Sequence, residues 1–595
     1  MPAKASNEVK TRIIHSQQKN GDIYVLERTT LYDSEKKYNK VLSTKLISKI
    51  PKGTEIPIPT RPKRDKISND RKNVPNGSLK KLVSSSSDKV VASRKRVGMM
   101  NIIDHIGKTS GIDDALYAST DVGTAQKIIS VARYLLATNG QSLPGIATWQ
   151  YNHPLPYTEG ISEEVYHRLF NEVGLDESLQ QSFFKSRCDM LNGGAGIAYD
   201  STTYSTYSEN QLEARYGFNK ASDGLKTVKY LALYSIEHRQ PIAFTKQPGD
   251  LPDVLTIGNA LNQLLALGVS GAEIITDNGY YSEQNISEMY QAHFDFITLA
   301  KTGLKWIKSE IDDHYNDMDK LSNVCPYDPT THGITVMLMR DFIKIRKYAN
   351  KKSRAAQGDE EIFSRRVYLH IFFNASRKVD EDQSFERDLL SLKEKLENGM
   401  SIDDLNDAAQ KKVKKYFVIR TWGKKTIISI NEKACAQAKK YHGYFVLVSN
   451  GEKDTFKALS KYRKREHIED YFRSSKQHAD SMRIRVWDAD TLRGRMFVQF
   501  ISLCYYEYLS ECVRKMKLSL GVPNGDHNHD LKQNLDLEKK LKSWLDNTPI
   551  YLQLQWFDAI EGVEISTSLH FKRWTTEMTK RDKMYAEKLG LKSAF

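Results

Sequence analysis

The chain has 595 residues, of which 39% are hydrophobic and 27% are charged. This length exceeds one ordinary core and predicts two to four structural units, while the composition excludes disordered and fibrous proteins. Lys and Arg number 89 against 74 Asp and Glu, which gives a net charge of +15. A positive excess attracts polyanions, so nucleic acid is the first partner to consider, although membrane-surface and ribosome-associated proteins share this charge.

No stretch of the sequence is suited to span a bilayer. The most apolar run, Met496 to Val513, is interrupted by Gln499, Glu507 and Glu511, and therefore predicts a packed internal helix. The first residues contain no apolar segment of signal-peptide type, which favours a protein kept in the cytoplasm. The five cysteines form no CxxC pair, which excludes a zinc ribbon and a disulfide framework.

The first third of the chain is predicted to contain three regions. Residues 1–58 should form a small β unit, because two β-rich runs flank a polar turn at Asp33–Lys37. Residues 59–97 are rich in Pro, Ser, Asn and basic side chains, which predicts a flexible basic linker able to follow phosphates. Residues 98–190 show helical periodicity, notably in TAQKIISVARYLLATNG, which ends on Gly140 as a helix C-cap would.

Strands alternate with helices after residue 190. GAGIAYDST, EIITDNG and DFITLAK read as strands and TVKYLALYSIEHRQPIAF as a hairpin, with helices in LPDVLTIGNALNQLLALGV and SEQNISEMYQAHF. Residues 191–304 are therefore expected to form the first part of a mixed α/β sheet with helices on its faces. Residues 305–442 mix β runs with a charged helical piece and predict a β-rich insertion. The α/β pattern resumes over 443–515, with a long helix from about Thr455, and 516–595 is predicted to be helical.

Two aspartates stand at the ends of predicted strands, Asp200 in IAYDST and Asp277 in IITDNG. Ligands collect at the carboxyl ends of strands in open α/β sheets, so both side chains could contribute to one site. Taken singly, however, an Asp at a strand end is more often a turn former or a helix N-cap. Neither residue identifies a site by itself.

The segment KYRKREHIEDYFRSSKQH is predicted to be part of one helix. At 100° per residue, six of its side chains fall within an arc of roughly 100°. They are Tyr462, Arg465, Glu469, Phe472, Arg473 and Lys476. One acid among three cations suits a site at which a carboxylate binds a metal ion and the cations bind DNA phosphates next to it. A solvent-exposed helix face with i,i+4 ion pairs gives the same pattern. The isolated helix leaves both interpretations open.

Three carboxylates together match the needs of phosphodiester chemistry. Two divalent cations a few ångströms apart can activate an attacking oxygen and stabilise a leaving oxygen. Magnesium takes oxygen ligands and keeps some of its waters, so a few carboxylates hold it without a Cys or His cage. The absence of Cys/His spacing in this chain agrees with such a site.

The predicted helix matches the Y-(2)-R-(3)-E-(6)-K signature of a large family of bacterial insertion-sequence DDE transposases, at Tyr462, Arg465, Glu469 and Lys476. DSTTYS, which begins at the first aspartate, and TDNGYYSEQNI around the second resemble the same family. The resemblance extends from about residue 100 to the C-terminus. It also implies that the helical region 98–190 binds DNA or forms a dimer.

The resemblance implies an α/β fold with an RNase H-like catalytic core and a β-rich insertion between the second and third acids. In such a core Asp200, Asp277 and Glu469 bind two Mg²⁺ ions, for which Mn²⁺ substitutes. Members of the family cut DNA at the ends of their own insertion sequence and join the 3′ ends to target DNA, with water as the first nucleophile. A cut-and-paste transposase is thus the expected function.

The resemblance also implies the partners of this chain. Tyr462, Arg465 and Lys476 would contact DNA phosphates near the cleavage point, with Arg473 as a helper. The expected partners are the terminal inverted repeats of the element and the target DNA, bound by a homodimer in the bacterial cytoplasm and its nucleoid. A homodimer is expected because two DNA ends joined in one event favour two active sites.

Two alternatives share these residues. An RNase H-like nuclease of branched or repair DNA would use the same three acids, and a non-catalytic DNA-binding protein derived from a transposase would keep them without cutting. The sequence departs from the family pattern at PGDLPDV, where relatives often have a Gly-Asn pair before the acid that corresponds to Asp253. This departure touches none of the three acids.

Overall fold

The computed structural model describes most of the chain as two compact units, Met1–Lys89 and Val90–Phe595. The described residues are 9–18, 20–33, 38–53, 58–59, 91–191, 196–345, 358–422, 425–478, 483–484, 486–521, 529–566 and 571–591. The predicted basic linker, 59–97, lies outside the described residues except at its two ends.

The first unit is a four-stranded antiparallel sheet in the order β1-β2-β3-β4. Its strands are β1 (Val9–Gln17), β2 (Ile23–Asp33), β3 (Tyr38–Ile50) and β4 (Ile58–Pro59). The two β-rich runs of the sequence form β2 and β3. Only Asp22 and Ser48 are buried among the described residues of this unit, so the described sheet is a single layer without an apolar core.

A ten-stranded mixed sheet forms the centre of the second unit, in the order β11-β12-β13-β16-β10-β9-β6-β7-β8, with β17 paired to β6. Its strands are β6 (Gly196–Thr206), β7 (Lys226–Ser235), β8 (Gln240–Pro248), β9 (Glu273–Thr276), β10 (Asp295–Ala300), β11 (Val324–Cys325), β12 (Asp328–Ile345), β13 (Glu360–Asn374), β16 (Tyr444–Ser449) and β17 (Arg483–Ile484). Strands β6, β9 and β10 run parallel, whereas β6, β7 and β8 are successive antiparallel neighbours. The predicted mixed α/β sheet is confirmed.

Helices pack around this sheet and bury it. They are α7 (Ile257–Ala266), α8 (Glu283–Gln291), α9 (Lys305–Asp313), α13 (Thr455–Arg463), α14 (Glu466–His478) and α15 (Ala489–Ser519). Every residue of β6 is buried, because helices as well as neighbouring strands cover it. The apolar run from Met496 to Val513 lies within α15 and is largely buried, as predicted.

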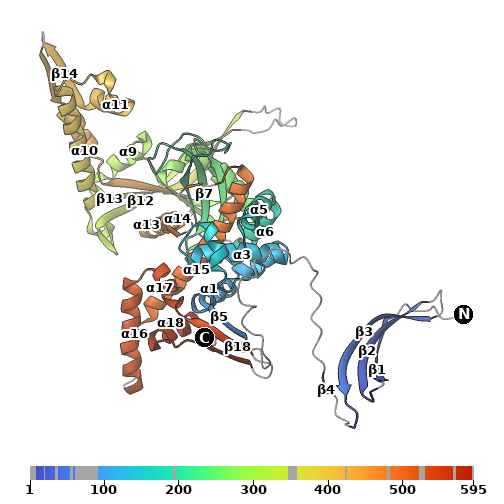
Figure 1. Ribbon diagram of the computed structural model, residues 1–595. Helices are drawn as coiled ribbons and strands as arrows, with labels where there is room; N and C mark the ends of the chain where they lie inside the picture. The colour runs from blue at the N-terminus through green and yellow to red at the C-terminus, as the bar shows by residue number, and fades with distance from the viewer. Residues whose placement is uncertain are drawn as a thin grey trace. The chain divides into compact units, whose positions relative to one another are not determined.

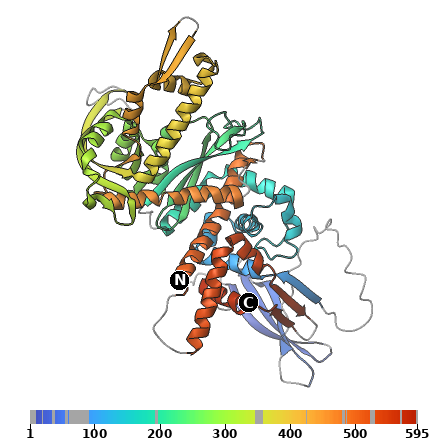
Figure 2. The same ribbon diagram turned by 90° about the vertical axis from the view of Figure 1, so that its left-hand side faces the viewer.

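The segment predicted as a β-rich insertion, 305–442, gives three of its strands to the large sheet. β13 pairs with β16 over Tyr368–Phe373 and with β12 on its other side. The middle part has a small core of its own, built from α10 (Ala375–Glu397), α11 (Asp407–Tyr416), α12 (Glu432–Lys439), β14 (Phe417–Trp422) and β15 (Lys425–Ile430). Figures 1 and 2 show α10 and β14 extending away from the sheet.

The region before the sheet is helical and shares its core. It contains α1 (Gly98–Thr109), α2 (Ile112–Ser119), α3 (Val122–Ala137), α4 (Ile146–Trp149), α5 (Glu163–Leu175) and α6 (Glu177–Met190). Helices α5 and α15 cross so closely that a Cβ added to Gly494 would lie 1.9 Å from the Phe170 carbonyl oxygen. Glycine is therefore required at this crossing.

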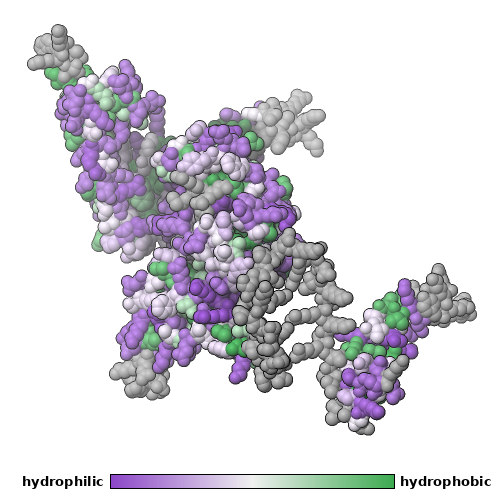
Figure 3. Space-filling model, viewed as in Figure 1, coloured by the Kyte–Doolittle hydropathy of each residue, from purple (hydrophilic) through white to green (hydrophobic). Residues whose placement is uncertain are grey.

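The C-terminal region, predicted to be helical, also contains two strands. Its elements are α16 (His529–Asn547), α17 (Ile550–Phe557), β18 (Glu561–Ser566), β19 (Phe571–Thr575) and α18 (Lys580–Leu589). β18 pairs with β19 and with β5 (Val91–Arg96), a strand far away in the sequence. No helix among the described residues is long and apolar enough to cross a membrane. Figure 3 shows that hydrophilic residues dominate the face seen there.

Candidate active site

The three acids predicted from the sequence lie in one groove. Asp200 is on β6, Asp277 directly follows β9, and Glu469 is in the first turn of α14. β6 and β9 are parallel neighbours in which Ala198 pairs with Ile275, so Asp200 and Asp277, each two residues further along the chain, lie side by side. Asp200 is therefore in the middle of β6, and the prediction that it stands at a strand end is wrong. The groove has a volume of about 690 Å³, and all three acids line it. We call it the acid groove.

Arg465 connects the three carboxylates. Its Nη1 donates to Asp200 Oδ2 at 3.0 Å, and its Nη2 donates to Glu469 Oε1 at 2.6 Å. The same Nη2 lies 3.9 Å from Asp277 Oδ2. The Arg465 side chain is only 9% exposed, so this cation faces the acids rather than solvent. A planar guanidinium can pair with several carboxylates at once, which a lysine cannot match.

Backbone and hydroxyl groups fix the two aspartates. Asp200 Oδ1 accepts from the Ser201 amide at 2.8 Å, and Asp277 Oδ1 accepts from the Asn278 amide at 2.7 Å. The Tyr462 hydroxyl donates to Asp277 at 3.2 Å. Burial raises the pKa of Asp200, although Arg465 acts on it in the opposite direction. Both aspartates are therefore held in place, whereas the Glu469 side chain is half exposed.

The predicted single helix from Thr455 is wrong, because the chain breaks it into α13 and α14. Tyr462 lies in the last turn of α13, Arg465 lies in the turn between the helices, and Glu469 lies on α14. No Gly or Pro marks this break, so nothing in the local sequence indicates it. The turn directs Arg465 at the acids, where its charge is paired.

Two of the predicted DNA contacts, Arg473 and Lys476, line the acid groove. Arg473 is largely exposed and pairs with Asp470 at 3.1 Å. Burial, and next the nearby Lys220, lower the pKa of Lys476. The other two, Tyr462 and Arg465, contact the acids themselves.

Sequence reasoning missed two further polar residues of the groove, Lys220 and Asp253. Lys220 donates from Nζ to the Ser201 carbonyl oxygen at 2.8 Å. Asp253 accepts from the Ser201 hydroxyl at 2.9 Å and from Lys229 Nζ at 2.7 Å. Asp253 stands out in the sequence only as a departure from the family pattern, and Lys220 lies in a connection without a motif.

Residues 192–505 match the family model of the transposase DDE domain. The match covers more than half of the chain, from just before β6 into α15, and includes the whole acid groove. The chain belongs to this transposase family. No curated protein matches it.

Among solved structures, the piggyBac transposase synaptic complex with hairpin DNA is similar to this transposase, with a TM-score of 0.32 and 8% sequence identity. The alignment covers 77% of this chain and 81% of that chain. At this TM-score the likeness supports no statement about fold or function.

The donor set of the transposase's acid groove suits a hard cation. Three carboxylates attract a single guanidinium, so the oxygens of Asp200, Asp277 and Glu469 form a place where positive charge is stabilised. Such oxygens are the ligands that Mg²⁺ prefers. The described part of the chain contains no group of three His, Cys, Asp or Glu side chains at metal-binding spacing, since Arg465 lies between the acids.

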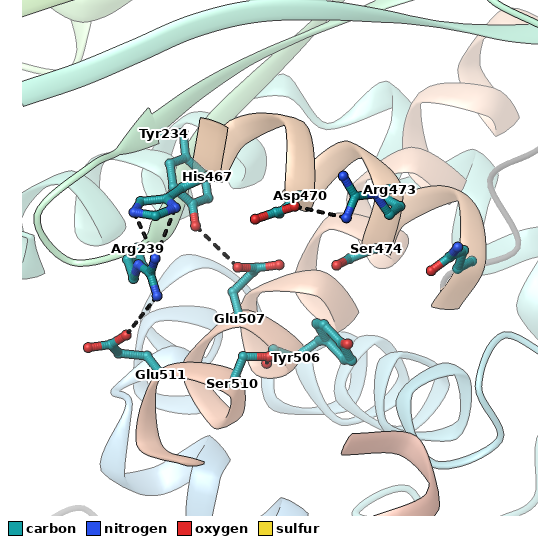
Figure 4. A pocket seen from close by; sticks show the side chains of 11 residues that line it. Tyr234, Arg239, His467, Asp470, Arg473, Ser474, Tyr506, Glu507, Ser510 and Glu511 are labelled. Atoms are coloured by element: carbon teal, nitrogen blue, oxygen red, sulfur yellow. Dashed lines mark hydrogen bonds and ion pairs between the residues drawn. The ribbon is translucent and has the colours of Figure 1, made fainter. Parts of the chain in front are cut away.

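A second cavity, of about 310 Å³, lies against the other face of α14 (Figure 4). Arg239, in the turn between β7 and β8, donates to His467 of α14 at 2.8 Å and lies 4.0 Å from Glu511 of α15. The Tyr234 hydroxyl donates to Glu507 of α15 at 3.1 Å. Burial raises the pKa of Glu507 to about 8. These contacts fix α14, and with it Glu469, between the sheet and α15.

Proposed function

We propose that this chain is a DDE transposase that cleaves DNA at the ends of its insertion sequence and joins the 3′ ends to target DNA. The observation that carries the proposal is the convergence of Asp200, Asp277 and Glu469 in one groove, inside the matched family domain. The three residues come from three separate elements of the chain. A structural role for each acid separately would not require them to share a groove.

We further propose that the catalytic core is RNase H-like. Its support is the strand order β8-β7-β6-β9-β10, in which three antiparallel strands are followed by two strands parallel to β6. In this arrangement the central strand β6 carries Asp200 and its parallel neighbour β9 leads to Asp277. Asp200 and Asp277 thus lie side by side where β9 ends against the middle of β6.

Asp200, Asp277 and Glu469 would hold two Mg²⁺ ions. Bound there, divalent ions activate the attacking oxygen and stabilise the leaving oxygen. The chain itself supplies rigidity, because Asp200 and Asp277 each accept a hydrogen bond from the following backbone amide. Glu469, half exposed on α14, would complete the set from the helix.

The cations of the groove would bind the DNA backbone. Lys476, Arg473 and Lys220 line the groove together with the acids, so a phosphate in the groove would meet positive charge as well as the carboxylates. Arg465, which now pairs with the carboxylates, would exchange one of them for a phosphate, and Tyr462, which donates to Asp277, would hold that acid in position. Joining two ends in one event calls for two active sites, so we propose a homodimer on the inverted repeats.

Incubation of the purified chain with labelled DNA tests this function. The DNA carries the sequences that flank the gene of this chain, and the buffer contains Mg²⁺ or Mn²⁺. We expect cleavage at those ends, and a loss of at least about 100-fold in Asp277→Ala, since this change removes a carboxylate from the proposed metal site. Asp313→Ala, an exposed aspartate on α9, is the control and should cut normally.

Two other outcomes would contradict the proposal. Equal cutting of unrelated branched DNA would indicate a structure-specific nuclease. Tight binding to the ends without any cleavage would indicate a DNA-binding protein that has lost its activity.

A further inference from the structure

The connection between β6 and β7, residues 207–225, borders the acid groove and exposes large apolar side chains. Leu212, Tyr216 and Phe218 are 77%, 71% and 76% exposed. Phe218 lines the acid groove together with Lys220 of the same connection. Single exposed apolar residues need no explanation, but a group of them beside a functional groove indicates an interaction surface.

Trp487 adds another exposed aromatic ring beside this connection. It is 70% exposed and precedes α15. The Gln211 side chain donates to the carbonyl oxygens of Val486 at 3.1 Å and of Asp488 at 2.7 Å, on either side of Trp487. These hydrogen bonds therefore hold the backbone on either side of Trp487 against the connection that carries Tyr216 and Phe218.

Ammonium groups lie near aromatic rings of this region. Lys226 Nζ lies 5.6 Å from the centre of the Tyr216 ring, and Lys220 Nζ lies 6.0 Å from the centre of the Phe472 ring, which also lines the groove. Lys476 lines the groove next to them. Aromatic faces interleaved with cations are the usual composition of surfaces that bind single-stranded nucleic acid, because bases stack and phosphates pair.

The connection has a defined conformation despite its exposure. The Lys220 amide donates to the Thr203 hydroxyl at 3.2 Å, and the Asn219 side chain donates to Asp223 at 2.6 Å. A Cβ added to Gly217 would lie 2.4 Å from the Gly249 carbonyl oxygen, so the backbone next to Phe218 packs against the end of β8. The rings are thus presented by a fixed backbone, which lowers the entropy cost of binding.

We propose that Tyr216, Phe218 and Trp487 form a stacking surface for unpaired nucleotides next to the acid groove. Duplex DNA hides the faces of its bases, so exposed rings at this place favour nucleotides that have left the helix near the point of cleavage. Lys220 and Lys476 complement the phosphates of those nucleotides. The inference rests on the proposed DNA-cleaving function, but it concerns binding and not the chemical step.

Binding of the full chain to two labelled DNAs, measured by fluorescence anisotropy in EDTA, tests this surface. One DNA is a fully paired end, and the other has the same sequence with a short unpaired 3′ tail carrying 2-aminopurine. We expect Phe218→Ala to weaken binding to the tailed DNA about tenfold, the loss expected for one stacked base, and to leave paired DNA unchanged. It should also abolish quenching of the 2-aminopurine.

Two further variants complete the experiment. Phe218→Trp keeps an aromatic face and should bind the tailed DNA as the unaltered chain does. Leu212→Ala removes an equally exposed aliphatic side chain from the same connection and should change neither affinity. Equal weakening of both DNAs in Phe218→Ala, or no weakening of either, would overturn the proposal.

Two controls distinguish nucleotide stacking from a protein contact and from DNA cutting. If Phe218→Ala changes the oligomeric state by light scattering and leaves binding of the tailed DNA intact, the surface contacts protein and the proposal is wrong. Because EDTA prevents metal-dependent cutting, the binding result does not depend on activity. A chain that prefers the tailed DNA but never cuts its ends would contradict the proposed function alone.

Discussion

At the scale of single residues, Arg465 governs the electrostatics of the acid groove. One guanidinium is within 4 Å of all three carboxylates and is almost fully buried. Its Nε is also buried and has no hydrogen-bond partner among the described residues. The two Nη atoms form the hydrogen bonds of this guanidinium, and their partners are carboxylates. A metal ion and this guanidinium draw on the same oxygens, and binding of one must disturb the other.

Arg465→Gln should lower stability and increase the response to metal. Without the guanidinium, Asp200 becomes an unpaired buried carboxylate, which costs about 3 kcal/mol. Thermal unfolding in EDTA should therefore occur at a lower Tm than in the unaltered chain, and Mn²⁺ should raise the Tm of the variant by more. Arg377→Gln, which removes an exposed i,i+4 pair with Glu381, is the control. Identical Tm values in EDTA would show that Arg465 does not neutralise the acids.

The sequence predicts the three acids that share the groove, but not all of their neighbours. Asp200, Asp277 and Glu469 each occur in a recognisable local context, so they could be found without a structure. Lys220 could not, because its place beside the acids depends on how the connection after β6 folds back onto Ser201. The same holds for Phe218, whose exposure has no signal in the sequence.

At the scale of elements, the break between α13 and α14 determines how the groove is built. A continuous helix would place Arg465 on the same stripe as Glu469, four residues away. The break instead puts Arg465 in a turn, from which it reaches β6 and the end of β9 as well. Helical periodicity predicts one helix for all six side chains, whereas Tyr462 lies on α13, Arg465 in the turn and the other four on α14. Tertiary contacts can outweigh local helix propensity in this way.

The buried Glu507 of α15, which accepts a hydrogen bond from Tyr234 of β7, makes the free energy of unfolding depend on pH. Burial raises the pKa of Glu507 from its ordinary value of 4.5 to about 8, so the folded chain keeps a proton that the unfolded chain releases. Stability contributed by this group is complete below pH 4.5 and is lost as the pH rises through 8. Between these two pH values the free energy of unfolding falls by roughly 3–5 kcal/mol, which lowers the Tm by a few degrees. Glu507→Gln removes this pH-dependent loss.

Thermal scans between pH 5 and pH 9 check this prediction. The Tm of the unaltered chain should fall more steeply than that of Glu507→Gln. Glu511 is a matched control one turn along α15. Burial acts to raise the pKa of Glu511, but the ion pair with Arg514 lowers it, and the pKa is below its ordinary value. Glu511→Gln should therefore destabilise the folded chain at neutral pH. Parallel Tm profiles for the unaltered chain and Glu507→Gln would contradict the role of burial.

At the scale of the whole molecule, strand pairing between distant segments was the least predictable feature. The β runs at 328–345 and 360–374 were visible in the sequence, but their pairing with β16 was not, because periodicity carries no information on partners. Neither β5 nor its partner β18 is predicted as a strand, because β5 falls in the predicted linker, 59–97, and β18 in the region predicted to be helical, 516–595. The mixed α/β class, in contrast, followed from the alternation of strands and helices.

The first unit stands apart from this pattern. Its described strands form one layer in which only Asp22 and Ser48 are buried. A sheet of this size without an apolar core gains little stability from burial. That the basic linker, 59–97, follows DNA phosphates stays a prediction from its composition and charge.

The joining of a cut end to target DNA tests the three-acid proposal most directly. Purified chain is incubated with pre-cut end DNA, a target plasmid and Mg²⁺, and the joined products are sequenced. We predict joined ends with the unaltered chain, and a loss of at least about 100-fold in Glu469→Gln with end binding retained, because only the acid on α14 is altered. Joining by Glu469→Gln at the unaltered rate would contradict the proposal.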